Sequence, residues 1–239
     1  MFTPVFDKID GTDYTLEMIT VCNANGDEFD DKDVGSGGTG KVANGKIQVM
    51  KLRDGKTELG ATWNYTSTAY AYRTMSYVLD TWAWGKNRNQ SLISGEGLIV
   101  YNGMGATVKF RVAGQVELKP QYNIPTGYSI YGNNYPGTIT LGKITVCNAN
   151  GDEFNDKTVE AGGTGKVGSG KIQVMKLREK KTELGSVWGY LSNAYDYRTN
   201  PAALDTWAWG KNRNQTLDPG EALIVYNGMG DEIIFKINP

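Results

Sequence analysis

The stretch ITVCNANGDEF at residues 19–29 occurs a second time, without a single change, at residues 144–154. The match extends outward from it. Residues 19–112 align with residues 144–237 without a gap, and 66 of these 94 positions are identical by direct count. This repeat is far longer than the roughly 20–50 residues of units that stack into solenoids. The sequence therefore predicts two globular domains in tandem, over residues 1–115 and 116–239, each large enough for its own core.

The apolar residues of each copy recur with a period of two, which is typical of β-strands, and no pattern predicts a long helix. YTLEMITV at residues 14–21 is a strand candidate. TWAWG at residues 81–85 alternates strictly, which predicts a strand with Trp82 and Trp84 on one face, and LIVY at residues 98–101 suits a central strand. We expect roughly seven to nine short strands per copy and an all-β fold of two tandem homologous β-sandwich (or small barrel) domains.

Composition and charge exclude several classes of protein. Of the 239 residues, 39% are apolar and 21% charged, which is typical of a folded chain that is neither disordered nor membrane-embedded. The 25 basic and 26 acidic residues are interspersed, so we expect no nucleic-acid partner. No apolar run approaches the roughly 18 residues that a membrane-spanning helix needs, and the N-terminal residues lack the pattern of a secretory signal. We therefore expect no membrane partner.

Each copy has one cysteine, at the same place in the apolar run ITVCN: Cys22 and Cys147. A disulfide within one copy would need two cysteines, which leaves either two free thiols or a bridge between the copies. Cysteine in an apolar strand usually packs as a small buried hydrophobe, which favours free thiols. Free thiols suit synthesis in a reducing cytoplasm.

The chain has no histidine, which removes the commonest general base, the usual serine and cysteine triads and most zinc sites. Two carboxylate pairs, Asp80 with Glu96 and Asp205 with Glu221, could serve glycoside hydrolysis, but turn-forming or solvated residues explain them easily. The glycines at residues 35–40 favour a loop between strands over a phosphate cradle, because no helix follows them. We expect a protein that is not an enzyme and that needs no cofactor.

One loop of each copy is rich in side-chain oxygens, the ligands that calcium prefers. It lacks the spacing of an EF-hand and the glutamate that closes one, and a solvated hairpin explains it as well. No metal is assigned to it, and its residues stay weak calcium candidates: Asn23, Asn25, Asp27, Asn148, Asn150 and Asp152.

The aromatic residues are the most suggestive feature, because they recur in both copies beside an arginine. Exposed coplanar rings can stack on sugars, whereas an aromatic on one face of a strand is more often part of the core. Core packing, a protein–protein interface and a glycan platform all stay open. The candidate binding residues are Trp63, Arg73, Trp82, Trp84, Trp188, Arg198, Trp207 and Trp209.

Three segments of the second copy carry a resemblance: IPTGYSIYGN at 124–133, PGTITLGKITV at 136–146 and PGEALIVYNG at 219–228. Together they resemble tandem-repeat β-domain proteins of bacterial and phage origin, which include structural proteins of virions. The first copy matches only from about Thr15 onward and has Ser94 where the second has Pro219. The resemblance brings no catalytic residues with it.

The resemblance implies a non-enzymatic structural protein, such as a capsid decoration or a head-fibre or tail-associated component. Its expected partners are other capsid and virion proteins or further copies of the same chain. The protein would be located in the virion after assembly in the host cytoplasm. The alternative is a tandem carbohydrate-binding module that holds a surface glycan with exposed tryptophan and tyrosine rings.

Overall fold

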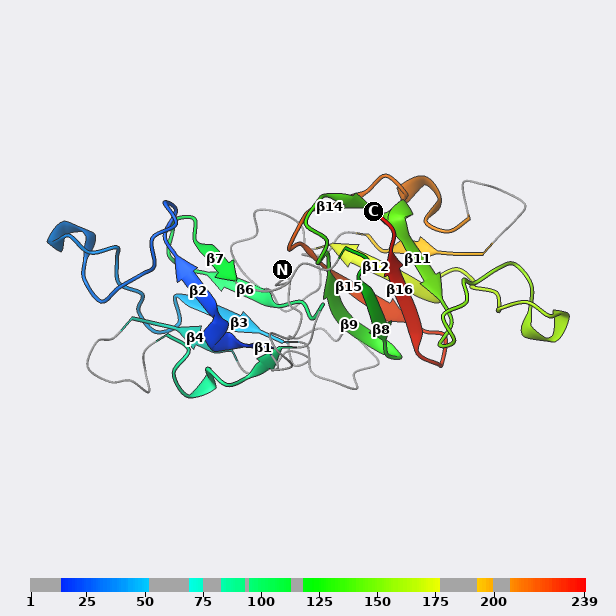
Figure 1. The fold of residues 1–239 in the computed structure, drawn as a ribbon, viewed down its shortest axis with the longest axis horizontal. Helices are drawn as coiled ribbons and strands as arrows, with labels where there is room; N and C mark the ends of the chain where they lie inside the picture. The colour runs from blue at the N-terminus through cyan, green and yellow to red at the C-terminus, as the bar shows by residue number, and fades with distance from the viewer. Residues whose placement is uncertain are drawn as a thin grey trace.

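The computed structural model of the chain describes residues 14–51, 69–74, 83–92, 95–112, 118–176, 193–199 and 207–239. Within them the chain forms β-strands and 3-10 helices of three residues each (Figure 1). The prediction of an all-β fold is confirmed. No helix in this part of the chain is long and apolar enough to cross a membrane.

The strands fall into two series along the chain. The first series comprises β1 (Tyr14–Thr15), β2 (Ile19–Cys22), β3 (Ile47–Met50), β4 (Tyr70–Tyr72), β5 (Ser91–Leu92), β6 (Ile99–Asn102) and β7 (Lys109–Val112). The second comprises β8 (Gln121–Ile124), β9 (Gly127–Gly132), β10 (Ile139–Thr140), β11 (Ile144–Cys147), β12 (Ile172–Lys176), β13 (Tyr195–Tyr197), β14 (Thr216–Leu217), β15 (Ala222–Asn227) and β16 (Ile233–Ile237).

The two copies pair their strands in the same way, always antiparallel. The sheet β4-β3-β6 of the first copy corresponds to β13-β12-β15 of the second, and the pairs β2-β7 and β1-β5 correspond to β11-β16 and β10-β14. The second copy adds β9 beside β15 and β8 beside β16. The register is also repeated, since Gln48 lies opposite Ala71 and Gln173 lies opposite Asp196. The sequence repeat is therefore a repeat of structure.

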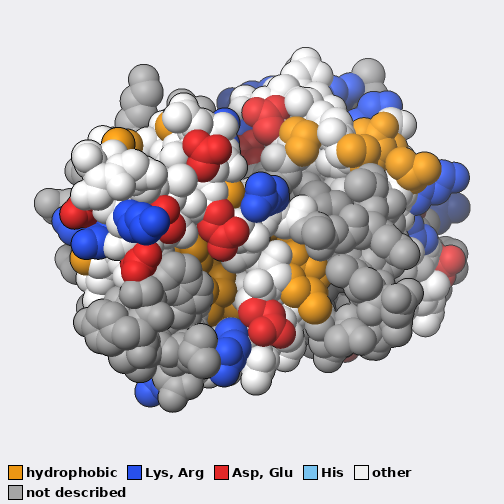
Figure 2. All heavy atoms as spheres, turned by 60° about the vertical axis from the view of Figure 1, so that its left-hand side comes forward, with side chains coloured by type: hydrophobic (Ala, Val, Ile, Leu, Met, Phe, Trp, Pro, Cys, Tyr) orange, Lys and Arg blue, Asp and Glu red, His pale blue; other side chains and the backbone are white. Residues whose placement is uncertain are grey.

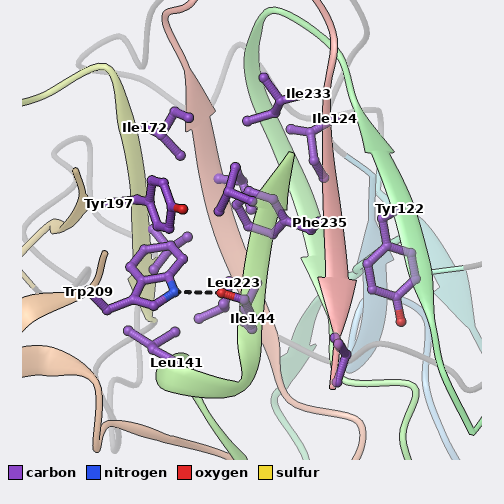
Figure 3. Close-up of a cluster of buried hydrophobic side chains, with 14 of the residues drawn as sticks. Tyr122, Ile124, Leu141, Ile144, Ile172, Tyr197, Trp209, Leu223, Ile233 and Phe235 are labelled. Carbon is purple, nitrogen blue, oxygen red and sulfur yellow. Dashed lines mark hydrogen bonds between the residues drawn. The ribbon is translucent and has the colours of Figure 1, made fainter. Parts of the chain in front are cut away.

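The core of the second copy gathers side chains from both of its larger sheets (Figure 3). Ile172 and Val174 of β12 are fully buried and alternate with less buried neighbours, as expected for a strand with one face on the core. β15 lies between β12 and β9, and all of Ala222–Val225 is buried. The LIVY run at residues 98–101, which is predicted to be a central strand, instead forms β6 at the end of the sheet β4-β3-β6, and only its counterpart at residues 223–226 is central.

The expected single strand at residues 14–21 is wrong. A 3-10 helix, η1 (Leu16–Met18), interrupts it, and η6 (Leu141–Lys143) does the same in the second copy. Residues three apart lie on one side of a 3-10 helix, so this turn brings both Leu16 and Ile19 into the core, where they are 0% and 2% exposed. An uninterrupted strand would point these two residues to opposite faces.

The two copies also share a small apolar cluster of their own. Met50 and Ile99 of the first copy pack with Ile130 and Ile224 of the second. The backbone N–H of Gly97 donates to the carbonyl of Ile130 at 2.9 Å, so the first copy continues the ladder along the second edge of β9. The copies are thus joined by packing and by hydrogen bonds as well as by the chain.

Both cysteines lie at the ends of equivalent strands, β2 and β11. Cys22 and Cys147 are free and buried, so the prediction of two buried free thiols is confirmed. Burial raises the pKa of both thiols above the ordinary value, which keeps them protonated and poorly nucleophilic at neutral pH.

Candidate functional site

The second tryptophan of each TWAWG segment belongs to the core. Trp209 is 2% exposed, its indole Nε1 donates to the carbonyl of Ile144 at 2.9 Å, and its ring meets Tyr197 edge-on at 5.3 Å (Figure 3). The first copy repeats these contacts through Trp84, Ile19 and Tyr72. Of the readings left open by the sequence, core packing is the one observed here. Neither Trp84 nor Trp209 can stack on a sugar.

The predicted strand at residues 81–85 is wrong over its described part. Ala83 has a φ of +49°, and Trp84 directly precedes the 3-10 helix η5 (Gly85–Asn87). The backbone N–H and carbonyl of Ala83 are both bonded to Arg73, and the left-handed residue then turns the chain so that Trp84 enters the core. Ala208 has a φ of +48° at the same place in the second copy.

Of the other predicted tryptophans, only Trp207 lies in the described part of the chain. Trp207 is half-buried, and its carbonyl accepts a hydrogen bond from the N–H of Gly210 at 2.8 Å. Trp63, Trp82 and Trp188 lie outside the described residues.

A polar cluster surrounds Asp196, in the middle of β13. Its carboxylate accepts hydrogen bonds from Ser169 Oγ at 2.9 Å and from Gln173 Nε2 at 2.7 Å, and it pairs with Arg198 Nη2 at 3.4 Å. The Asp196 side chain is 18% exposed and that of Arg198 is 40% exposed. A cavity of about 390 Å³ beside the pair is also lined by Lys211. Three side chains thus hold the carboxylate, which stays partly exposed.

In the first copy, Arg73 is the counterpart of Arg198, but the counterpart of Asp196 is Ala71. The sequence singled out both arginines and missed the aspartate. The available signal was the difference within the otherwise matched segments YAYRT and YDYRT, at residues 70–74 and 195–199.

The calcium candidates form a tight turn. Asn23 Oδ1 accepts the backbone N–H groups of Asn25, Gly26 and Asp27 at 2.9–3.0 Å, so this oxygen is committed to the turn. Asn148 Oδ1 likewise accepts from Asn150 and Asp152. In the described part of the chain, no three acidic or cysteine side chains gather where they could hold a metal ion. Calcium binding stays a prediction.

The next segment, residues 28–41 and 153–166, forms a structured loop that we call the tip loop. In the first copy Asp30 Oδ1 accepts the N–H groups of Lys32 and Thr39 at 2.9 and 3.1 Å. A Cβ on Gly38 would lie 2.6 Å from the Lys32 carbonyl, so only glycine fits there. In the second copy Asn155 makes the same two bonds. The side chain at this position therefore shapes the loop whether or not it is charged.

The tip loops carry exposed apolar residues. Val34 and Val159 are 72% and 70% exposed, and each begins the 3-10 helix of its loop, η2 (Val34–Ser36) or η7 (Val159–Ala161). The two loops lie at opposite ends of the long axis of the molecule (Figure 1). In the first copy a groove of about 430 Å³ runs beside the loop, lined by Val34, Phe29 and Met104 among others.

The structure describes only the glutamate of each predicted carboxylate pair. Glu96 pairs with Lys51 at 3.0 Å and Glu221 with Lys176 at 2.7 Å. Their suggested partners, Asp80 and Asp205, lie outside the described residues.

Basic and acidic side chains are interspersed on the face of the molecule shown in Figure 2, as the sequence predicts.

Comparison of the chain with protein-family models, with curated proteins and with solved structures gives no match. A functional assignment therefore depends on the residues and on their geometry.

Proposed function

We propose that the protein is a non-enzymatic structural component of a virion, such as a capsid decoration or a head-fibre or tail-associated protein, acting through protein–protein contacts. In this proposal residues 1–115 and 116–239 are two tandem β-sandwich domains. The chain is assembled into the particle in the host cytoplasm and meets other virion proteins or further copies of itself there.

The division into two domains is supported by the buried clusters. One cluster contains only residues of the first copy, from Tyr14 to Leu98, and a separate one contains only residues of the second, from Tyr122 to Ile237. Each draws on more than one sheet of its copy, which is how two packed sheets bury their inner faces.

The observation that carries the proposed function is the pair of tip loops. The two tip loops have the same shape, each carries an exposed valine, and they lie at the two ends of the long axis of the molecule (Figure 1). Two weak contacts on one chain give avidity on a particle that repeats the same acceptor. The absence of histidine from the sequence and the resemblance to virion proteins favour the same reading.

The glycan-binding alternative loses part of its basis. It needs exposed tryptophan and tyrosine rings, and two of its candidate indoles, those of Trp84 and Trp209, are buried. We therefore propose only the assembly role.

The test uses particles from the host of origin. Mass spectrometry of purified virions should find the protein in a fixed ratio to the capsid protein. Particles that lack it should rebind the purified chain. Val34→Asp and Val159→Asp should each weaken rebinding, because a single contact gives no avidity, and the double variant should abolish rebinding, because neither contact is left. Leu118→Asp is the matched control, since Leu118 is 66% exposed but lies outside the tip loops. Absence of the protein from purified virions, together with no rebinding, would contradict the proposal.

A further inference from the structure

In the second copy, a carboxylate of the chain itself, that of Asp196, is bound by neighbouring side chains. As described above, Asp196 accepts from one hydroxyl and one amide and pairs with one guanidinium. Hydrogen bonds to an ionised group are shorter and stronger than those between neutral groups, and guanidinium suits the planar carboxylate well. The chain itself supplies both the donors and the acceptor.

The first copy has the same backbone at this place. Gln48 lies directly opposite Ala71, as Gln173 lies opposite Asp196. The N–H of Arg73 donates to the Ala83 carbonyl at 3.1 Å, and the equivalent bond in the second copy is 3.0 Å. The repeat aligns Asn44 with the donor Ser169. Each donor position therefore still holds a residue that can donate a hydrogen bond.

The acceptor is missing from the first copy. Ala71 has no polar side chain, and the Arg73 Nε is buried with no hydrogen-bond partner among the described residues. Within the same part of the chain, no carboxylate pairs with Arg73, and the Gln48 side-chain amide makes no hydrogen bond. A buried donor without a partner is costly. In the second copy Asp196 meets Arg198 at Nη2, so a carboxylate that binds the Arg73 guanidinium through both Nη2 and Nε would also satisfy the unpartnered Nε.

We infer that Asn44, Gln48 and Arg73 form a site for a carboxylate that comes from another molecule. Ala71 has no carboxylate where the second copy places that of Asp196, so the first copy takes an external carboxylate while the second copy uses its own. The ligand class is a carboxylate, carried by an aspartate or glutamate side chain or by a chain terminus. The inference stands apart from the proposed virion role, because it concerns the isolated protein and a small ligand.

The test follows the side-chain Nε–Hε signals of the arginines by NMR in the ¹⁵N-labelled full chain. Two probes distinguish the sources of the carboxylate: N-acetylaspartate α-methylamide for a side chain and N-acetylglycine for a chain terminus. Acetamide is the neutral control. We expect one of the carboxylates, and not acetamide, to shift the Arg73 signal in a saturable manner and to leave the Arg198 signal in place.

Three variants separate the site from general attraction to positive charge. Ala71→Asp should weaken the response at Arg73 by about tenfold or more, because the site is then filled from within. Ala71→Asn, which has nearly the same size without the charge, should weaken it less. Asp196→Ala should add a second response, at Arg198. An Arg73 signal that ignores both carboxylates, or that responds equally in the wild type and Ala71→Asp, would overturn the inference.

Discussion

The two copies keep the same interior and differ where they meet other groups. The buried pairs Trp84 with Trp209 and Val42 with Val167 are identical residues in equivalent places. At the edge, by contrast, Lys109 of β7 is exposed, whereas its counterpart Ile234 of β16 is buried, because β8 pairs with β16 in the second copy. The comparison teaches that the core fixes which residues are retained, while each surface has followed its own neighbours.

The largest effect should come from breaking the shared core. Trp84→Ala and Trp209→Ala should each lower the free energy of unfolding by about 3–5 kcal/mol, because each removes a buried indole and leaves a cavity. Chemical denaturation followed by circular dichroism measures this. Trp84→Phe and Trp209→Phe are the milder controls, which lose the Nε1 hydrogen bond but keep most of the packing. A pair of alanine variants as stable as the wild type would mean that these indoles are not core.

A smaller effect should come from the contact between the copies, which the repeat does not duplicate. A Cβ on Gly97 would lie 2.1 Å from Ile130 Cγ2, so Gly97→Ala should destabilise the chain by about 1–3 kcal/mol. Ile130→Ala removes the clashing methyl group, and the double variant should be more stable than the two single effects predict when added. Gly35→Ala is the control, because nothing lies near its added Cβ. Additive effects would argue against this contact.

The smallest effect should be a difference between the two tip loops in their response to acid. Backbone N–H groups donated to Asp30 lower its pKa below the ordinary value of 3.8, so the stabilisation is present above that value and is lost as pH falls through the lowered pKa. Asn155 does not titrate, so its loop should keep its bonds. NMR of the Lys32 and Thr39 amides between about pH 5 and pH 2, against Lys157 and Thr164, measures the difference. Equal responses in both loops, or a response that survives Asp30→Asn, would contradict this.

The sequence alone predicts the repeat and the all-β fold, because identical residues and a period of two are local signals. It wrongly predicts a strand around Ala83. The alternating pattern is typical of a strand, but Ala83 has a left-handed backbone conformation that turns the chain. It also cannot show that Asp196 faces Gln173, since that pairing depends on the register of strands joined by a long connection. The contact of Gly97 with Ile130 likewise depends on how the copies pack.

The second copy completes its carboxylate site with its own Asp196, and the first copy leaves the equivalent place to a carboxylate of another molecule. Exchanging the two residues in one chain, Ala71→Asp together with Asp196→Ala, tests this most directly. The exchange should leave the overall stability nearly unchanged and should move the carboxylate-dependent NMR shift from Arg73 to Arg198. A shift that stays at Arg73 in the exchanged chain, or that is absent from both arginines, would contradict the account.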